Sequence, residues 1–179
     1  MWHAPCVKWH YDYVGPAEIR GQVRVGVRGA AITSSGDLEA WLGGLPSGER
    51  EEPCTFVIEL DGTLMLASRH SEHVACAAGE PVLSAGEVAF VREGGRWLVS
   101  EVSNQSTGCC PDVTSWPAVE SALERAGLGH PGTFTHPMVF RRCTACHQRN
   151  IVKDDFYVCA VCEAPLPRAW NVNQPDEPV

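Results

Sequence analysis

The chain has 179 residues, of which 44% are apolar and 20% charged, values typical of a globular protein that can bury a core. It contains no apolar run near eighteen residues, which excludes a membrane-spanning helix. The formal net charge of −8 disfavours the broad basic surface that non-specific nucleic-acid binding needs, and seventeen glycines with thirteen prolines indicate a turn-rich β or α+β protein.

The first seventeen residues are rich in aromatic and ligand-capable side chains. His3, Cys6 and His10 could form half of a metal site, but no complementary pair follows them. We therefore expect the Trp and Tyr rings of this segment to pack on the rest of the protein. No signal peptide is visible at the start of the chain, and ligand-like cysteine spacing fits reduced thiols. Both features predict a cytoplasmic, bacterial protein.

Alternating valines predict a strand over residues 19–27, with arginines on its polar face. Residues 35–42 predict a short helix, with Ser34 or Ser35 as the N-cap and two glycines after its end. The strongest local signal is the pair Asp61-Gly62 between apolar runs at 55–60 and 63–67, which predicts a β-hairpin.

Two more strands are predicted at residues 87–91 and 97–102, and the short link between them requires antiparallel pairing. Residues 116–126 have an amphipathic pattern that begins after Ser115, which predicts a second helix. The expected fold class is therefore α+β, an antiparallel hairpin and meander domain with two short helices.

Two polar segments, residues 69–76 and 103–111, flank these strands and could meet across a compact sheet. A structural interpretation carries most weight, because Asn, Ser, Thr and Gly form turns through bonds between side chain and backbone.

Two catalytic interpretations of the same segments remain open. His70 and Glu72 match the His-x-Glu part of the zinc deaminase signature, in which His binds zinc and Glu moves protons. The downstream element offers adjacent Cys109 and Cys110, whose side chains point in different directions and chelate poorly. Alternatively, Cys109 or Cys110 near His70 or His73 would supply a nucleophilic thiolate and its base.

Part of this region, residues 70–111, resembles a pattern in the plant IQM calmodulin-binding family and in some bacterial proteins. The matching residues are His70-Ser71, Ala85-Gly86-Glu87, Gly95 and the block 106–111. Gly108 and Cys109 stand where that family has His and Tyr, and no IQ sequence is present. The resemblance implies a shared β-rich module, and neither calmodulin binding nor an activity.

Four cysteines near the C-terminus have the spacing of metal ligands. Cys143 and Cys146 form one CxxC pair, and twelve residues later Cys159 and Cys162 form another. Two such pairs can place four thiolates at the corners of a tetrahedron around Zn²⁺, which leaves no position for water or substrate. The metal is therefore expected to be structural. Four thiolates also suit iron, so electron transfer is the alternative.

Residues 141–170 resemble the zinc ribbon, or rubredoxin-type knuckle. The short gap between the pairs predicts a hairpin, with strands at 151–152 and 156–158 around a polar turn at 153–155. A unit of this size buries little apolar surface, so the metal should supply its folding free energy. The residues expected to dock the ribbon on the rest of the chain are Pro165, Leu166 and Trp170.

The predicted organisation is an α+β domain at 1–137, a zinc ribbon at 138–170 and a flexible tail at 171–179. Most of the chain is acidic, but residues 141–170 carry a formal charge of +2 before the four thiolates are counted. We expect a regulatory or protein-interaction module that presents a structural ribbon to a protein partner. The expected contact residues are Arg141, Arg149, Lys153 and the Trp-rich N-terminus.

Two other functions remain open. An enzyme would work at a crevice between the two polar segments, and a second zinc ion that depends on His70 and Cys109 would favour it. A nucleic-acid-binding accessory protein would instead use the basic residues Arg141, Arg142, Arg149 and Lys153.

Overall fold

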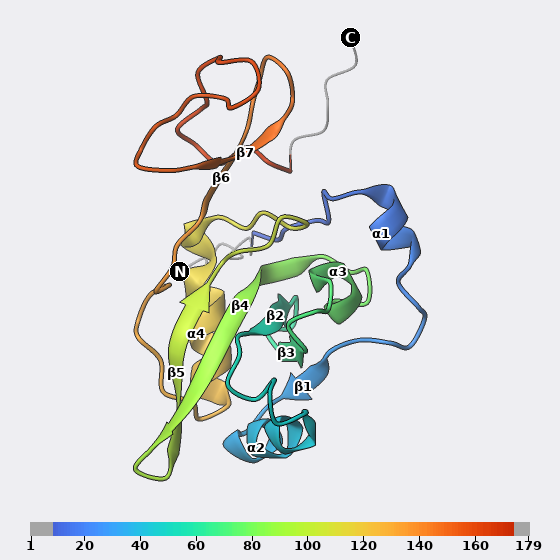
Figure 1. Ribbon diagram of the computed structural model, residues 1–179, viewed down its shortest axis with the longest axis vertical. Coiled ribbons are helices and arrows are strands. Elements are labelled where there is room, and N and C mark those ends of the chain that lie inside the picture. Colours follow the sequence, from blue (N-terminus) through green and yellow to red (C-terminus); the bar gives the residue numbers. More distant parts are fainter. Residues whose placement is uncertain (1–8, 174–179) are drawn as a thin grey trace, which may run out of the picture.

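The computed structural model describes residues 9–173, and its centre is a five-stranded sheet (Figure 1). The strand order is β1-β3-β2-β4-β5, and all neighbouring strands are antiparallel. The strands are β1 (Ala30–Ile32), β2 (Cys54–Glu59), β3 (Leu64–Ala67), β4 (Val82–Glu93) and β5 (Arg96–Ser103). The expected α+β class is confirmed. No helix in the described part of the chain is long and apolar enough to cross a membrane.

The hairpin predicted at Asp61-Gly62 joins β2 to β3. Gly62 has φ +87°, a conformation that L side chains rarely adopt, and the Asp61 carboxylate accepts a bond of 2.8 Å from the Thr63 N–H. The second predicted hairpin joins β4 to β5 through Gly94 and Gly95, both with positive φ. The residues of these two turns therefore favour the pairing of β2 with β3 and of β4 with β5.

Both predicted helices are present, as α2 (Ser35–Gly44) and α4 (Trp116–Arg125). Ser34 caps α2, because its hydroxyl accepts a bond of 3.1 Å from the Asp37 N–H. Two further short helices, α1 (Ala17–Gly21) and α3 (His73–Cys76), have no counterpart in the sequence prediction, and a 3₁₀ turn, η1 (Val113–Ser115), precedes α4.

The strand predicted over residues 19–27 is wrong. The segment contains α1 and then irregular turns, and the strand that follows begins only at Ala30. Alternating apolar side chains stabilise a strand only if one face of it is buried. Here Val25 is fully exposed and Val27 is more than half exposed. No neighbouring strand pairs with this part of the described chain, so its valines have nothing to pack against.

Side chains on the two faces of the sheet enter two separate cores, as the period of two along a strand requires. Phe56 and Leu66 face α2 and α4 and pack with Leu123 in the larger core. Val57 and Met65, one position along the same strands, enter a smaller core. The residues that cover that second face include Tyr11, Cys76, Cys109 and Trp170.

A second sheet of two antiparallel strands, β6 (Val139–Arg142) and β7 (Arg149–Val152), lies at one end of the molecule (Figure 1). The hairpin predicted between residues 151–152 and 156–158 is therefore wrong. β7 pairs with β6 instead, with Ile151 opposite Phe140. The predicted polar turn is present, with positive φ at Asp154 and Asp155, but the chain beyond it runs to the second cysteine pair.

The residues after the second cysteine pair join this unit to the large sheet. Trp170 docks as expected: its ring stands edge-on to the Tyr11 ring, with 5.1 Å between the ring centroids, and its Nε1–H donates to Cys110 O at 2.9 Å. Leu166 instead packs inside the small unit with Cys143 and Cys159.

The beginning of the expected tail is also ordered. Asn171 is buried, and its side-chain amide bonds both the N–H and the carbonyl of Arg142. Residues 174–179, which make up most of the expected tail, lie outside the described part of the chain.

Asn104, completely buried after β5, ties two connecting segments together. Its Nδ2 donates to Pro111 O and Met138 O, both at 2.8 Å, and its Oδ1 accepts from the Met138 N–H at 2.7 Å. The residue thus holds the loop after β5 against the entry to β6.

Replacing Asn104 with Ala should lower the free energy of unfolding by about 2–4 kcal/mol, because the change leaves buried backbone groups without partners. Urea unfolding of the metal-loaded protein measures this loss. The matched control is Gln105→Ala at the exposed neighbouring position, which should change the free energy of unfolding by less than about 0.5 kcal/mol. Equal effects of the two variants would contradict this role for Asn104.

Candidate metal centre

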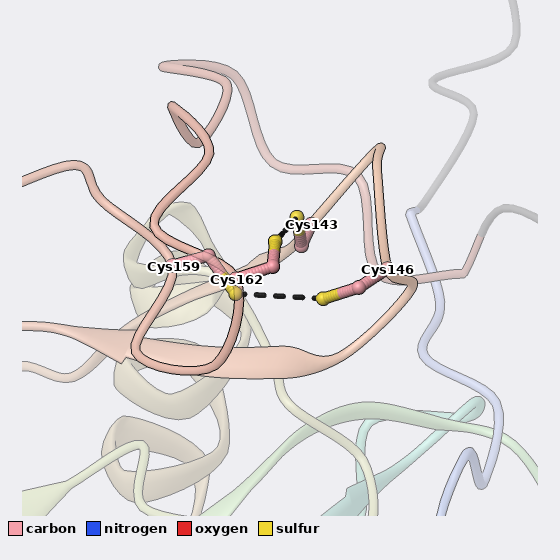
Figure 2. Close-up of side chains that lie close together, drawn as sticks. All are labelled: Cys143, Cys146, Cys159 and Cys162. Atoms are coloured by element: carbon pink, nitrogen blue, oxygen red, sulfur yellow. Dashed lines mark hydrogen bonds between the residues drawn. The ribbon is translucent and has the colours of Figure 1, made fainter.

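The four predicted ligand cysteines meet at one point (Figure 2). Their sulfur atoms all lie within 4.8 Å of one another, and the Cys143–Cys162 and Cys146–Cys159 pairs are both 3.6 Å apart. A tetrahedral centre with Zn–S bonds of about 2.3 Å has sulfurs about 3.8 Å apart. A disulfide would require about 2.05 Å. The cysteines are therefore positioned to bind a metal ion.

Each cysteine pair lies on a turn of the same design. In both turns the N–H of the first cysteine bonds the carbonyl five residues later, and the N–H four residues later bonds back to the cysteine carbonyl. The bonds are Cys143 N–H to Gln148 O (2.9 Å), His147 N–H to Cys143 O (3.0 Å), Cys159 N–H to Ala164 O (2.8 Å) and Glu163 N–H to Cys159 O (3.0 Å). Two copies of one turn thus direct four sulfurs to a common centre.

The turns also require an unusual backbone conformation at their fifth residue. His147 and Glu163 have φ of 62° and 60°, in the left-handed region that glycine adopts most easily. No glycine marks these two positions in the sequence, so the turn type could not be read from residue preference alone.

Backbone N–H groups favour the thiolate form of two ligands. The N–H groups of Cys146 and then Ala145 lower the pKa of Cys143, and those of Cys162 and Val161 lower the pKa of Cys159 to about 6. Because the thiolate is the form that binds a metal, these bonds reduce the proton competition that metal binding must overcome.

Asn150 is a supporting residue that the sequence analysis missed. This buried side chain donates through Nδ2 to the Cys159 sulfur at 3.5 Å, and its Oδ1 accepts from the Ala160 N–H at 2.9 Å. Asn150 lies on β7, directly after the first turn, so it connects that turn to the second. Its Asn-Ile-Val context suggested only a strand.

Two of the arginines expected to contact a partner or nucleic acid are buried. Arg141 is 7% exposed, and its guanidinium donates to Phe140 O and twice to Arg168 O. Arg142 is 9% exposed and bonds His147 Nδ1 at 2.7 Å. Arg141 is therefore not available as a surface contact, and the exposed basic residues of the predicted set are Arg149 and Lys153.

The alternative catalytic residues occupy different environments. His70 and Glu72 are exposed, whereas Cys109 and Cys110 are both 2% exposed, and Cys109 packs in the smaller core. Burial raises the pKa of Cys109 to about 11 and that of Cys110 to about 12, so both thiols are protonated at neutral pH. Within residues 9–173, the four ribbon cysteines are the one group of three or more metal-ligating side chains that converges.

The two polar segments approach each other through His73 rather than His70. The His73 imidazole is bonded through Nε2 to Gly86 O at 2.9 Å, and the Gly86 backbone packs directly against Ser103. This contact ties α3 to β4 and occupies His73 Nε2. Of the predicted N-terminal half-site, His10 is exposed, and His3 and Cys6 lie outside the described residues.

Loss of one ligand should open the small unit to protease. We expect Cys143→Ser to make the chain cleavable by trypsin after the exposed Lys153, because the remaining core of the unit is too small to hold it folded without metal. Mass spectrometry of timed digests locates the cut. Cys54→Ser, at a buried thiol far from the metal site in sequence, is the control and should leave the unit resistant, as in the unchanged protein.

Asn150→Ala should speed transfer of the metal to a chelator by about tenfold, since residues that hold metal ligands in place commonly have effects of this size. A chromogenic chelator follows the transfer. Gln148→Ala, at an exposed neighbouring side chain, should leave the rate unchanged. Equal rates for the two variants would remove the supporting role of Asn150.

His73 should make stability depend on pH. Burial lowers its pKa in the folded protein, an effect larger than the opposing influence of the Gly86 bond and of Glu87 and Glu72. The unfolded chain, with a histidine pKa of about 6.5, therefore binds the proton first as the pH falls, and stability is lost below about pH 6.5 by about 1 kcal/mol per pH unit. His73→Gln should flatten urea-unfolding free energies measured between pH 7 and pH 5.

No protein-family model, no curated protein and no solved structure matches this chain. The zinc-ribbon and IQM resemblances therefore rest on the residues that suggested them, and the function must be argued from the geometry of the site.

Proposed function

We propose that the four cysteines hold one structural zinc ion and that the resulting ribbon is the binding face of a cytoplasmic protein-interaction module. Cys143, Cys146, Cys159 and Cys162 would all be ligands. Four thiolates around one divalent ion close the coordination sphere, so zinc would supply folding free energy and no reaction. Zinc suits this task because it has no redox chemistry of its own.

One observation supports the binding role, namely an apolar surface beside the second cysteine pair. Ile151, Phe156 and Val161 are 40%, 68% and 66% exposed. They are the large apolar side chains that this unit exposes. We call these three side chains, with the adjoining hollow that Ile151 and Phe156 line, the ribbon face.

The ribbon face has room for a side chain of a partner. Its hollow has a volume of about 540 Å³, and Lys153, Val158, Ala160 and Glu163 also line it. Clusters of exposed apolar side chains rimmed by charges are typical of protein-binding surfaces. The proposed partner is thus a protein that inserts an apolar side chain into the hollow beside Phe156 and Ile151.

The face would depend on the metal, because Cys159, Ala160 and Glu163, which line part of the hollow, belong to the turn that bears Cys159 and Cys162. A partner that recognises the folded turn would bind only the metal-bound form of the protein. Zinc would then act as the condition for binding and would not touch the partner.

A photo-reactive amino acid at position 160, which lines the hollow, tests the proposed role in cells that make the protein. We expect a discrete crosslinked protein whose yield falls about tenfold with Phe156→Ser, as for an aromatic anchor at an interface centre. The yield should fall equally with Cys162→Ser, which removes a ligand and leaves the apolar side chains in the sequence.

The control for this experiment is Val25→Ser, because Val25 is as exposed as a side chain can be and lies outside the ribbon. This variant should retain the crosslink. A crosslink that survives Phe156→Ser, or that is lost equally with Val25→Ser, would contradict the proposed binding face even if zinc is present.

A further inference from the structure

A second cavity, larger than the hollow of the ribbon face, lies beside α4. Its volume is about 690 Å³, within the range of about 300–1,000 Å³ that small-molecule sites occupy. The walls come from five parts of the chain: the N-terminal segment, the turn at Gly62, the start of β4, α4 with the loop before it, and Trp170 after the ribbon.

Most of the cavity wall is apolar. Trp9, Tyr11 and Trp170 supply aromatic rings, and Leu83, Pro117 and Ala118 supply aliphatic surface. Trp9 is 73% exposed, which is unusual for the largest apolar side chain and leaves its ring open to a ligand. These walls fit a flat, apolar part of a small molecule, such as an aromatic ring.

The polar groups at one end of the cavity already have hydrogen-bond or charged partners within the protein. The Asp112 carboxylate accepts a bond from the Thr114 hydroxyl at 2.8 Å and lies 3.7 Å from the Arg141 guanidinium. Ser115 bonds the Ser84 hydroxyl at 2.9 Å. This end offers no unsatisfied charge to a ligand.

Arg125 lies at the other end, and its positive charge has no ion-pair partner in the described part of the chain. Its Nε donates to Ser121 O at 3.3 Å and its Nη2 to Gly62 O, so two backbone carbonyls fix the plane of the guanidinium. Its Nη1 makes no hydrogen bond to any of residues 9–173, and no carboxylate among them forms an ion pair with the guanidinium.

Asp61 interacts with Arg125 but forms no ion pair with it. Asp61 owes its lowered pKa chiefly to the backbone N–H and hydroxyl of Thr63, and Arg125 adds a smaller contribution from a distance. A fixed guanidinium beside an apolar wall is the arrangement that binds a carboxylate or sulfonate on an apolar molecule.

We propose that this cavity binds a small aromatic acid, with its ring between Trp9, Trp170 and Ala118 and its anionic group on Arg125 Nη1. The site is separate from the metal centre and from the ribbon face.

Two fluorescent probes of nearly the same shape test the proposal on the full, metal-loaded chain. 1-Anilinonaphthalene-8-sulfonate is an aromatic anion, and N-phenyl-1-naphthylamine lacks the sulfonate. We expect one saturable site for the anion per chain. Arg125→Gln should weaken binding of the anion by about tenfold and leave the uncharged probe unaffected. The matched control, Arg24→Gln at another exposed arginine, should change neither affinity.

A second variant keeps the test decisive if Arg125→Gln disturbs the turn at Gly62. Ser121→Leu fills the cavity from an exposed helical position, leaves Arg125 in place and should abolish binding of both probes. Phe156→Ser should leave both affinities unchanged, which separates this site from the ribbon face. Equal binding of the anion by the unchanged protein and by Arg125→Gln, or binding that survives Ser121→Leu, would overturn the proposal.

Discussion

The convergence of four cysteine sulfurs, all within 4.8 Å of one another, is the constraint on which the proposed metal unit near the C-terminus depends. β6 and β7 have four residues each, and the core beneath them includes the ligands Cys143 and Cys159 together with Val152 and Leu166. Without a metal, ionised thiolates at these distances would repel one another. A metal ion bound as proposed would remove this repulsion and hold the two cysteine pairs together.

The large sheet needs no such link, because both of its faces are covered by apolar side chains from helices and from the N-terminal segment. The segment that leaves the ribbon contacts both units. Asn171 accepts a hydrogen bond from the Arg142 N–H on β6, and Trp170 donates one to Cys110 O in the loop after β5. Trp170 also forms one wall of the large cavity. The segment that leaves the ribbon thus connects the metal centre to the cavity beside α4.

Local chemistry made some of this structure predictable. Asp61-Gly62 indicates a hairpin because few other residue pairs accept that turn, and two CxxC pairs indicate a metal site because thiolates at that spacing chelate. Tertiary context decided the rest. The valines after Ile19 had no partner strand, β7 paired with β6, and Arg141 found backbone carbonyls inside the protein. Asn104 and Asn150 carry no local signal, because their importance lies in bonds to residues distant in sequence.

Elemental analysis of the full chain, purified without chelators, tests the metal centre most directly. The account predicts one zinc ion per chain and no visible absorption, and replacement of zinc by cobalt should produce the absorption bands of a tetrahedral thiolate site. A chain with no bound metal would contradict the account, and so would one that contains iron and a rubredoxin-like visible spectrum.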